Sequence, residues 1–116
     1  MQPRELRQRK VSNMKKSDLL SNKVFKEADA DLPIKYVQAD GKEVKLGEVT
    51  WARMTGQIYW DASYASISKR GLLTNSDFCA ARHDSEILIE FSDYRRETWN
   101  CDVELRDGFI TIIELP

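Results

Sequence analysis

The sequence has little of the material from which catalytic and metal sites are built: one histidine and two cysteines among 116 residues. Because His83 is the only histidine, any triad or imidazole acid–base scheme would have to pass through it. The five glycines are isolated, so there is no glycine-rich phosphate loop. The cysteines have no Cys-x-x-Cys spacing and too few companions for a structural zinc site. No metal site is predicted.

Long hydrophobic runs are also missing. No apolar stretch approaches the roughly 18 residues that cross a bilayer. The basic N-terminus is not followed by the apolar segment of a signal peptide. The sequence therefore predicts a cytoplasmic protein with no membrane partner, in which Cys79 and Cys101 are buried, reduced thiols.

The remaining candidates for catalysis are weak. Cys79 and His83 are four residues apart, a helical spacing for a thiolate–imidazole pair, but a buried Cys79 and a surface His83 are the favoured reading. Asp84 and Glu86 share one strand face without any sign of the desolvation that a glycosidase-like pair needs. We predict that the protein is not an enzyme and binds no cofactor or small-molecule substrate.

Charge is divided unevenly along the chain. Residues 1–16 carry six basic and one acidic side chain, 6 − 1 = +5, and the other hundred carry 12 basic and 18 acidic side chains, 12 − 18 = −6. An acidic body is repelled by phosphates. We interpret residues 1–16 as a basic flexible arm, which is either a solvated terminus or a contact to DNA or an acidic protein surface.

Residues 17–116 are predicted to form a single β-rich domain without internal repeats. Apolar residues every four positions, after a capping serine or aspartate, predict one helix over about 17–29, which ends before Pro33. From Ile34 the period falls to two. An Asp40-Gly41 pair between two alternating segments predicts a β-hairpin with a type I′ turn.

Further strands are expected over 87–91, 99–105 and 109–115. Asp107-Gly108 predicts a second tight turn, and the nearly continuous apolar strand after it is expected to be central. Trp51 and Trp99 are placed in the core. The predicted fold is mainly β: a small antiparallel β-barrel or sandwich of five to six strands, with one N-terminal α-helix and a long loop.

That long loop, about 54–75, is the most informative stretch of the sequence. Loops above about 12–15 residues are uncommon in compact domains unless they are functional or disordered, and this one is rich in aromatics. Aromatic and basic side chains of this kind are enriched at protein interfaces. The alternative is that Tyr59, Trp60 and Ile67 form a strand or a flap over the core. The predicted partner-binding residues are Arg4, Arg7, Arg9, Lys10, Tyr59, Trp60, Tyr64, Lys69, Arg70 and Leu72.

The order of these elements resembles a known family. The stretches that carry the resemblance are Glu48–Trp51 before the loop, Ser76–Phe78 after it, Asp84–Ile89, Thr98–Val103 and Asp107–Leu115. Over about 17–115 the chain is similar to the head-closure, or head–tail joining, proteins of tailed bacteriophages. The resemblance implies a ring-forming structural protein of the virion neck, present in the host cytoplasm during assembly. It would bind a portal or adaptor protein, a tail protein and copies of itself, with the arm and the long loop ordered on assembly.

Two other functions remain open. The acidic body suits a small inhibitor, such as an immunity or anti-defence protein, that binds one target enzyme one-to-one. A single-stranded nucleic-acid module would use Tyr59, Trp60, Lys69 and Arg70.

Overall fold

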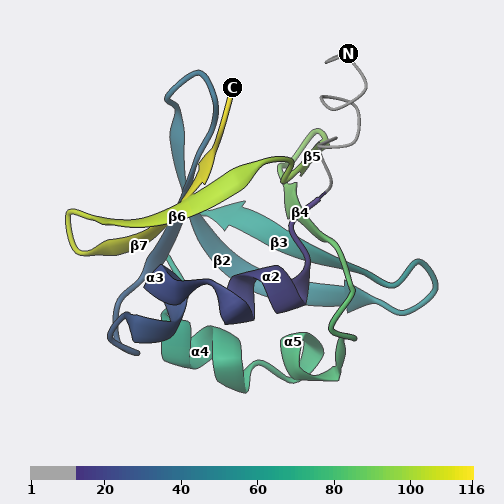
Figure 1. Cartoon of the computed structure of the whole chain (residues 1–116). Coiled ribbons are helices and arrows are strands. Elements are labelled where there is room, and N and C mark those ends of the chain that lie inside the picture. Colours follow the sequence, from purple (N-terminus) through teal and green to yellow (C-terminus); the bar gives the residue numbers. More distant parts are fainter. Residues whose placement is uncertain (1–12) are drawn as a thin grey trace, which may run out of the picture.

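The computed structural model describes residues 13–116 as a curled β-sheet with short helices gathered on one side (Figure 1). Over this range the helices are α2 (Lys16–Ser21), α3 (Lys23–Glu27), α4 (Lys69–Thr74) and α5 (Ser76–Ala80). The strands are β1 (Ile34–Val37), β2 (Glu43–Ala52), β3 (Gln57–Ser63), β4 (Ile87–Glu90), β5 (Arg95–Glu97), β6 (Cys101–Arg106) and β7 (Phe109–Glu114). The mainly β fold is as predicted.

The sheet is mixed and strongly curled. Its order in the described part of the chain is β5-β4-β3-β2-β1-β7-β6, with the β1–β7 and β3–β4 pairs parallel and the other four antiparallel. The two end strands, β5 and β6, are joined by residues 98–100 alone, which span at most about 14 Å. The sheet must therefore curl into a half-barrel. The Arg96–Glu114 ion pair, 2.9 Å long, links β5 to β7 across its open side.

The core lies between the curled sheet and the helices. Its largest fully buried side chains include Trp60 and Tyr36 from the strands and Phe25 and Phe78 from the helices. The helices close one side of the sheet's interior with Leu19, Phe25, Leu72 and Phe78. The strands fill this interior mainly with isoleucine: Ile34, Ile58, Ile87, Ile89, Ile110 and Ile112.

Both predicted hairpins form, with different turns. Asp107 and Gly108 have φ of 51° and 79°, as a type I′ turn requires. In the first hairpin Gly41 has a positive φ but Asp40 does not, and the Gln38 N–H donates to the Lys42 carbonyl oxygen at 2.8 Å. The type I′ prediction is therefore wrong there: this is a three-residue loop closed by a glycine in the left-handed region. The terminal strand β7 lies inside the sheet, between β1 and β6, as expected.

The single helix over 17–29 is wrong. Asn22 has φ −66° and ψ 130°, which ends α2, and its side chain accepts a hydrogen bond from the Phe25 N–H at 3.1 Å, which starts α3. Asparagine competes in this way with the backbone hydrogen bonds of a continuous helix.

The long loop over 54–75 is also wrong. It contains β3, in which Ile58 and Trp60 point inward while Tyr59 and Asp61 are partly exposed, and then the helix α4. The proposed arm is shorter than 1–16, because Asn13 and Lys15 form β-bridges and Lys16 begins α2. The structure says nothing of residues 1–12, so the rest of that prediction lies outside the described residues.

Three burial predictions need correction. Trp99 is 45% exposed, because the chain between β5 and β6 turns it out of the barrel. Trp51 is partly buried against the core. Both cysteines are free thiols, but Cys79 is exposed on α5 and only Cys101 is partly buried.

The expectation of no internal repeat is wrong as well. Residues 16–28 and 69–81, 53 positions apart, share the pattern Lys-x-x-Leu-Leu-(Ser/Thr)-Asn-x-x-Phe-x-x-Ala. Each stretch forms two short helices broken at its asparagine, and each asparagine caps the second helix. We call residues 13–64 repeat 1 and residues 66–116 repeat 2.

The two repeats exchange lysine side chains. The ammonium of Lys16 in repeat 1 donates to three carbonyl oxygens at the end of α5 in repeat 2, at 2.7, 3.4 and 2.8 Å. The ammonium of Lys69 in repeat 2 donates to three at the end of α3 in repeat 1, at 2.7, 2.9 and 2.8 Å. Each also lies over the ring of the capped helix's phenylalanine, at 5.1 and 5.2 Å. Both lysines are more than 90% buried.

Backbone contacts between the repeats are reciprocal in the same way. Lys15 forms a bridge with Glu86, and the equivalent Ser68 forms one with Pro33. The two parallel pairs, β1–β7 and β3–β4, likewise join a strand of one repeat to a strand of the other. The repeats are thus related by an approximate two-fold axis and share one core.

We expect Lys16→Met and Lys69→Met each to lower the free energy of unfolding by about 1.5–3 kcal/mol, the worth of hydrogen bonds to a charged group. Each substitution leaves buried helix-end carbonyls without donors. Urea denaturation measures the loss. Lys23→Met, at an exposed position of α3, is the control and should stay within about 0.5 kcal/mol of wild type. Losses that small for both buried lysines would contradict the capping role.

Candidate protein-binding surface

An aromatic turn joins β4 to β5 at the surface. Phe91 and Tyr94 stack with ring centroids 4.9 Å apart and an interplanar angle of 15°. The Phe91 N–H donates to the Tyr94 carbonyl oxygen at 2.8 Å, which closes the turn over Ser92 and Asp93. Tyr94 is 52% exposed. The pair therefore presents a rigid apolar face to solvent.

A larger hollow of about 570 Å³ lies on one side of this turn. Its lining combines Phe91 and Ser92 with the start of β2 and the end of β3. Tyr64, directly after β3, also lines it and is 99% exposed. Gly47 lets the neighbouring backbone come close, because a Cβ there would lie 2.7 Å from the Cβ of Ser63.

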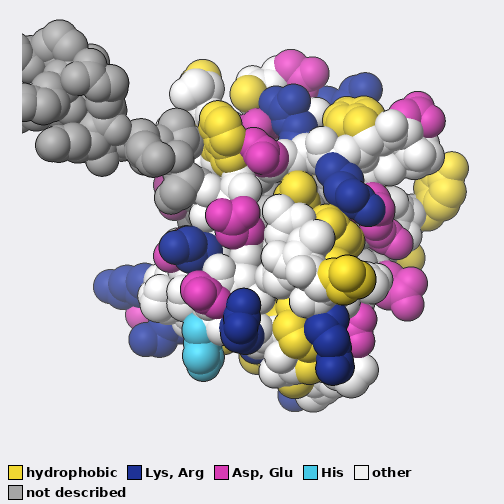
Figure 2. Space-filling view, turned by 90° about the vertical axis from the view of Figure 1, so that its right-hand side faces the viewer, with side chains coloured by type: hydrophobic (Ala, Val, Ile, Leu, Met, Phe, Trp, Pro, Cys, Tyr) yellow, Lys and Arg dark blue, Asp and Glu magenta, His cyan; other side chains and the backbone are white. Residues whose placement is uncertain are grey.

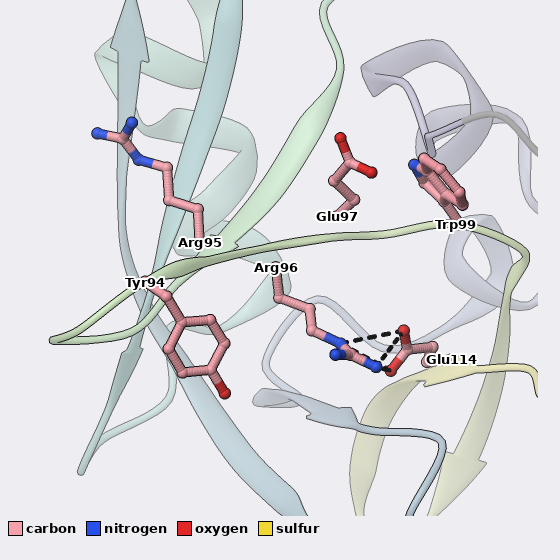
Figure 3. A pocket seen from close by; sticks show the side chains of 6 residues that line it. All are labelled: Tyr94, Arg95, Arg96, Glu97, Trp99 and Glu114. Carbon is pink, nitrogen blue, oxygen red and sulfur yellow. Dashed lines mark hydrogen bonds and ion pairs between the residues drawn. The ribbon is translucent and has the colours of Figure 1, made fainter.

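A smaller hollow of about 290 Å³ lies on the other side of the turn (Figure 3). Tyr94 and Trp99 line it together with charged side chains of β5 and β7. Figure 3 shows Arg96 and Glu114 pointing toward each other, while Arg95 points away from this pair. The Arg96 guanidinium donates to both oxygens of Glu114, at 2.9–3.2 Å. This pair fixes β5 against β7 and raises the pKa of Arg96.

The turn and the two hollows form one continuous surface. Tyr64 and Phe91 line the larger hollow, Phe91 stacks on Tyr94, and Tyr94 and Trp99 line the smaller one. We call these four side chains the aromatic surface. The described chain begins beside it, since Asn13 forms a bridge with Trp99.

Charges flank the aromatic surface on the outer face of the sheet. Asp61, Glu90 and Arg95 are cross-strand neighbours on β3, β4 and β5. Arg95 pairs with Glu90 at 3.3 Å and covers the ring of Tyr59 at 3.9 Å. Partial burial, and then the adjacent Glu90 and Glu48, raise the pKa of Asp61.

Two titratable groups lie inside the half-barrel behind the smaller hollow. Burial, followed by Cys101 and Glu114, raises the pKa of Tyr36, whose hydroxyl has no hydrogen-bond partner among the described residues. Burial raises the pKa of the Cys101 thiol to about 12. At neutral pH both groups are protonated, which disfavours their use as nucleophiles.

The predicted partner-binding residues do not lie together on the surface. Trp60, Lys69 and Leu72 are buried and do not reach the surface. Trp60 donates its indole N–H to the Gly47 carbonyl oxygen, and Lys69 caps α3. The nucleic-acid hypothesis loses two of its four residues this way, because bases stack only on accessible rings.

The other predicted residues have different surroundings. Tyr64 belongs to the aromatic surface, and Tyr59 lies beneath Arg95. Arg70 forms an exposed ion pair with Asp31, 2.8 Å long, at the start of α4. The arm residues Arg4, Arg7, Arg9 and Lys10 lie outside the described residues.

Sequence reasoning missed Phe91, Tyr94, Arg95 and Trp99. A signal was present: Ser92 and Asp93 are turn formers between two aromatic residues. Residues 54–75 are also rich in aromatic side chains, but Trp60 of that stretch is buried in the core.

The rest of the described surface offers no comparable feature. Residues 13–116 contain no group of three or more histidine, cysteine or acidic side chains placed to hold a metal ion. In the same range no helix has the length and apolar character needed to cross a membrane. Figure 2 shows positive and negative side chains intermixed over one face, without a continuous basic patch.

No family model matches the sequence, and no curated protein or solved structure is significantly similar to it. A functional conclusion therefore depends on the arrangement of the side chains.

We expect Asp61→Asn to stabilise the protein at neutral pH but not near pH 4. A raised pKa means that the folded state holds the Asp61 proton more tightly than the unfolded chain, whose pKa is about 3.9. The proton on Asp61 therefore stabilises the wild-type protein fully below pH 3.9, and this stabilisation is lost as the pH rises through the raised pKa. At pH 7.5 Asp61→Asn removes the repulsion between the two carboxylates and should raise the free energy of unfolding by about 0.2–1 kcal/mol. Urea denaturation at pH 4 and pH 7.5 measures both values.

Asp93→Asn, at an exposed turn position, is the control for the loss of one charge. If Asp61→Asn raised the free energy of unfolding equally at the two pH values, that would contradict the raised pKa of Asp61.

Iodoacetamide at pH 8 is expected to alkylate Cys79 in the native protein and to spare Cys101. Cys79 is exposed, whereas burial keeps the Cys101 thiol protonated. Intact mass should show one adduct on the native protein, none on a Cys79→Ser variant, and two on wild type in urea. A native Cys79→Ser protein that gains an adduct as fast as wild type would refute this.

Proposed function

We propose that this protein is a non-enzymatic, protein-binding structural protein and that the aromatic surface is its interface. The observation that carries the proposal is the row Tyr64, Phe91, Tyr94 and Trp99 around two hollows. Tyrosine, tryptophan and phenylalanine supply large contact areas at low entropic cost and are enriched at interface hot spots.

The polar surroundings of this surface also suit a protein partner. Arg95 and Glu97 stand beside the aromatic rings, as charged residues do at an interface rim. A single-stranded nucleic acid would be repelled by the neighbouring carboxylates of Asp61, Glu90 and Asp93.

The resemblance to phage head-closure proteins suggests the assembly in which this surface works. In that assembly the protein forms a ring between a portal or adaptor and a tail protein. A ring needs two different, complementary surfaces on each copy. Residues 1–12 carry 4 − 1 = +3, and residues 13–116 carry 14 − 18 = −4, so the arm and the body are complementary in this sense.

We expect light scattering after size exclusion to show a monomer that gives way to oligomers as protein concentration rises. Oligomers should weaken between 50 and 500 mM NaCl, because screening reduces attraction between exposed charges. Neutralising Arg4, Arg7, Arg9 and Lys10 to Gln should have the same effect as salt.

A control variant removes equal charge from exposed basic residues of the body: Lys23, Lys26, Lys42 and Arg53 to Gln. It should associate at least as well as wild type, since its body is more acidic. A wild-type protein that stays monomeric up to millimolar concentration would overturn the self-assembling function.

The acidic body favours one alternative, a small inhibitor of a basic enzyme. Acidic domains associate rapidly with basic enzymes through electrostatic attraction. That function predicts a persistent monomer and a salt-sensitive one-to-one complex with a single enzyme. The same scattering experiment therefore separates the two.

A further inference from the structure

We propose that the aromatic turn, residues 91–94, is the contact through which one copy of this chain holds a second copy. The inference rests on the proposed self-assembly and adds to it the turn that makes the contact. The same molecule contains an equivalent turn without aromatic residues, in repeat 1.

The aromatic turn has a structural twin in repeat 1. The 38–42 turn joins β1 to β2, as the 91–94 turn joins β4 to β5. The strand registers correspond, since Val37 pairs with Glu43 and Glu90 pairs with Arg95. The closing hydrogen bonds correspond too: 38 N–H to 42 carbonyl and 91 N–H to 94 carbonyl, both 2.8 Å. The second turn is one residue shorter and lacks a counterpart of Gly41.

The correspondence extends to the two hollows. Directly after the turn the offset between repeats is 52, so Glu43, Val44 and Lys45 match Arg95, Arg96 and Glu97. The first three line the larger hollow and the second three line the smaller one. Ala62 and Glu114 are matched in the same way. The two hollows are therefore the same place in the two repeats.

At this place the repeats differ in aromatic content. Phe91 stands where repeat 1 has Gln38, and Tyr94 where it has Lys42. Trp99 lies after β5, where repeat 2 departs from the continuous β2 strand of repeat 1. Repeat 1 closes the same hairpin without the rings of Phe91 and Tyr94, so the turn does not require them. Phe91 packs partly against the core, whereas Tyr94 and Trp99 are 52% and 45% exposed. Exposed apolar side chains that the fold does not need mark an interaction site.

The chemistry of the arm matches this surface. Arginine guanidinium groups stack on aromatic faces and pair with carboxylates. The arm supplies Arg4, Arg7 and Arg9, and the turn supplies two rings next to Asp93. The occupant that fits is a second copy of this chain, which brings its basic arm to the aromatic turn of the first.

The test replaces the turn by its twin in the full-length chain. The variant F91Q/S92A/Y94K gives residues 91–94 the sequence Gln-Ala-Asp-Lys, which matches repeat 1 apart from Gly41. Because Phe91 packs partly against the core, we expect a lower melting temperature but a folded protein. We expect an association constant, from sedimentation velocity, at least about 10-fold lower than that of wild type.

A second variant, Tyr94→Ala, guards against misfolding of the first, because Tyr94 is half-exposed and outside the core. It should also weaken association. The matched control is M54Q/L105Q, which removes two exposed apolar side chains at other hairpin ends and should leave association unchanged.

The outcomes separate the two proposals. If wild type associates and both turn variants associate equally well, the aromatic turn is not the contact, while self-assembly stands. If the control loses as much as the turn variants, association depends on general surface hydrophobicity and the inference is wrong. If wild type does not associate at all, self-assembly fails and the inference fails with it.

Discussion

The fold depends on the exchange of two buried lysines between the repeats. Helices of five or six residues are unstable alone, and each leaves unsatisfied carbonyl groups at its C-terminus. A buried ammonium is equally costly unless it finds acceptors. Lys16 and Lys69 solve both problems at once, because each donates to the helix end of the other repeat. Neither repeat supplies the donor for its own helix-end carbonyl oxygens, so we expect the two to fold as one unit.

The same exchange determines where the strands lie. With the helices held crosswise on one side, β1 reaches β7 and β4 reaches β3, both in parallel, and the hairpins complete the curved sheet. This places the polar hydrogen-bond network on the helical side and leaves the β4–β5 turn and the two hollows free of it. At the hollows the constraints are strand pairing and the Arg96–Glu114 ion pair, and the exposed side chains Tyr64, Tyr94 and Trp99 are able to change without loss of the core.

The parts of this fold that sequence predicted are local ones. Asp-Gly pairs and alternating apolar residues are enough to give both hairpins and the β7 strand, because turn chemistry and period two act over neighbouring residues. The parallel pairs join strands about 30 and 75 residues apart by sequence, where no local signal exists. The sequence places Lys16 in the basic arm and Lys69 among the partner-binding residues, since no local pattern marks a lysine that caps a distant helix. Trp60 is predicted to be an interface residue because the stretch around it is rich in aromatic side chains. Ile58 and Trp60 are nevertheless two positions apart, the spacing of side chains on one face of a strand.

An internal repeat distinguishes residues that the fold needs from residues that it tolerates. Positions identical in both repeats, such as Lys16 and Lys69 or Asn22 and Asn75, make equivalent hydrogen bonds and are explained by the fold. Positions that differ while the backbone stays the same need another explanation. Gln38 and Lys42 of repeat 1 are such positions, since Phe91 and Tyr94 replace them in an equivalent turn. Trp99 is half-exposed beside the smaller hollow, in the break between β5 and β6. Its indole lies near the stacked rings of Phe91 and Tyr94. Such a group of exposed aromatic side chains is best explained by a partner that covers it.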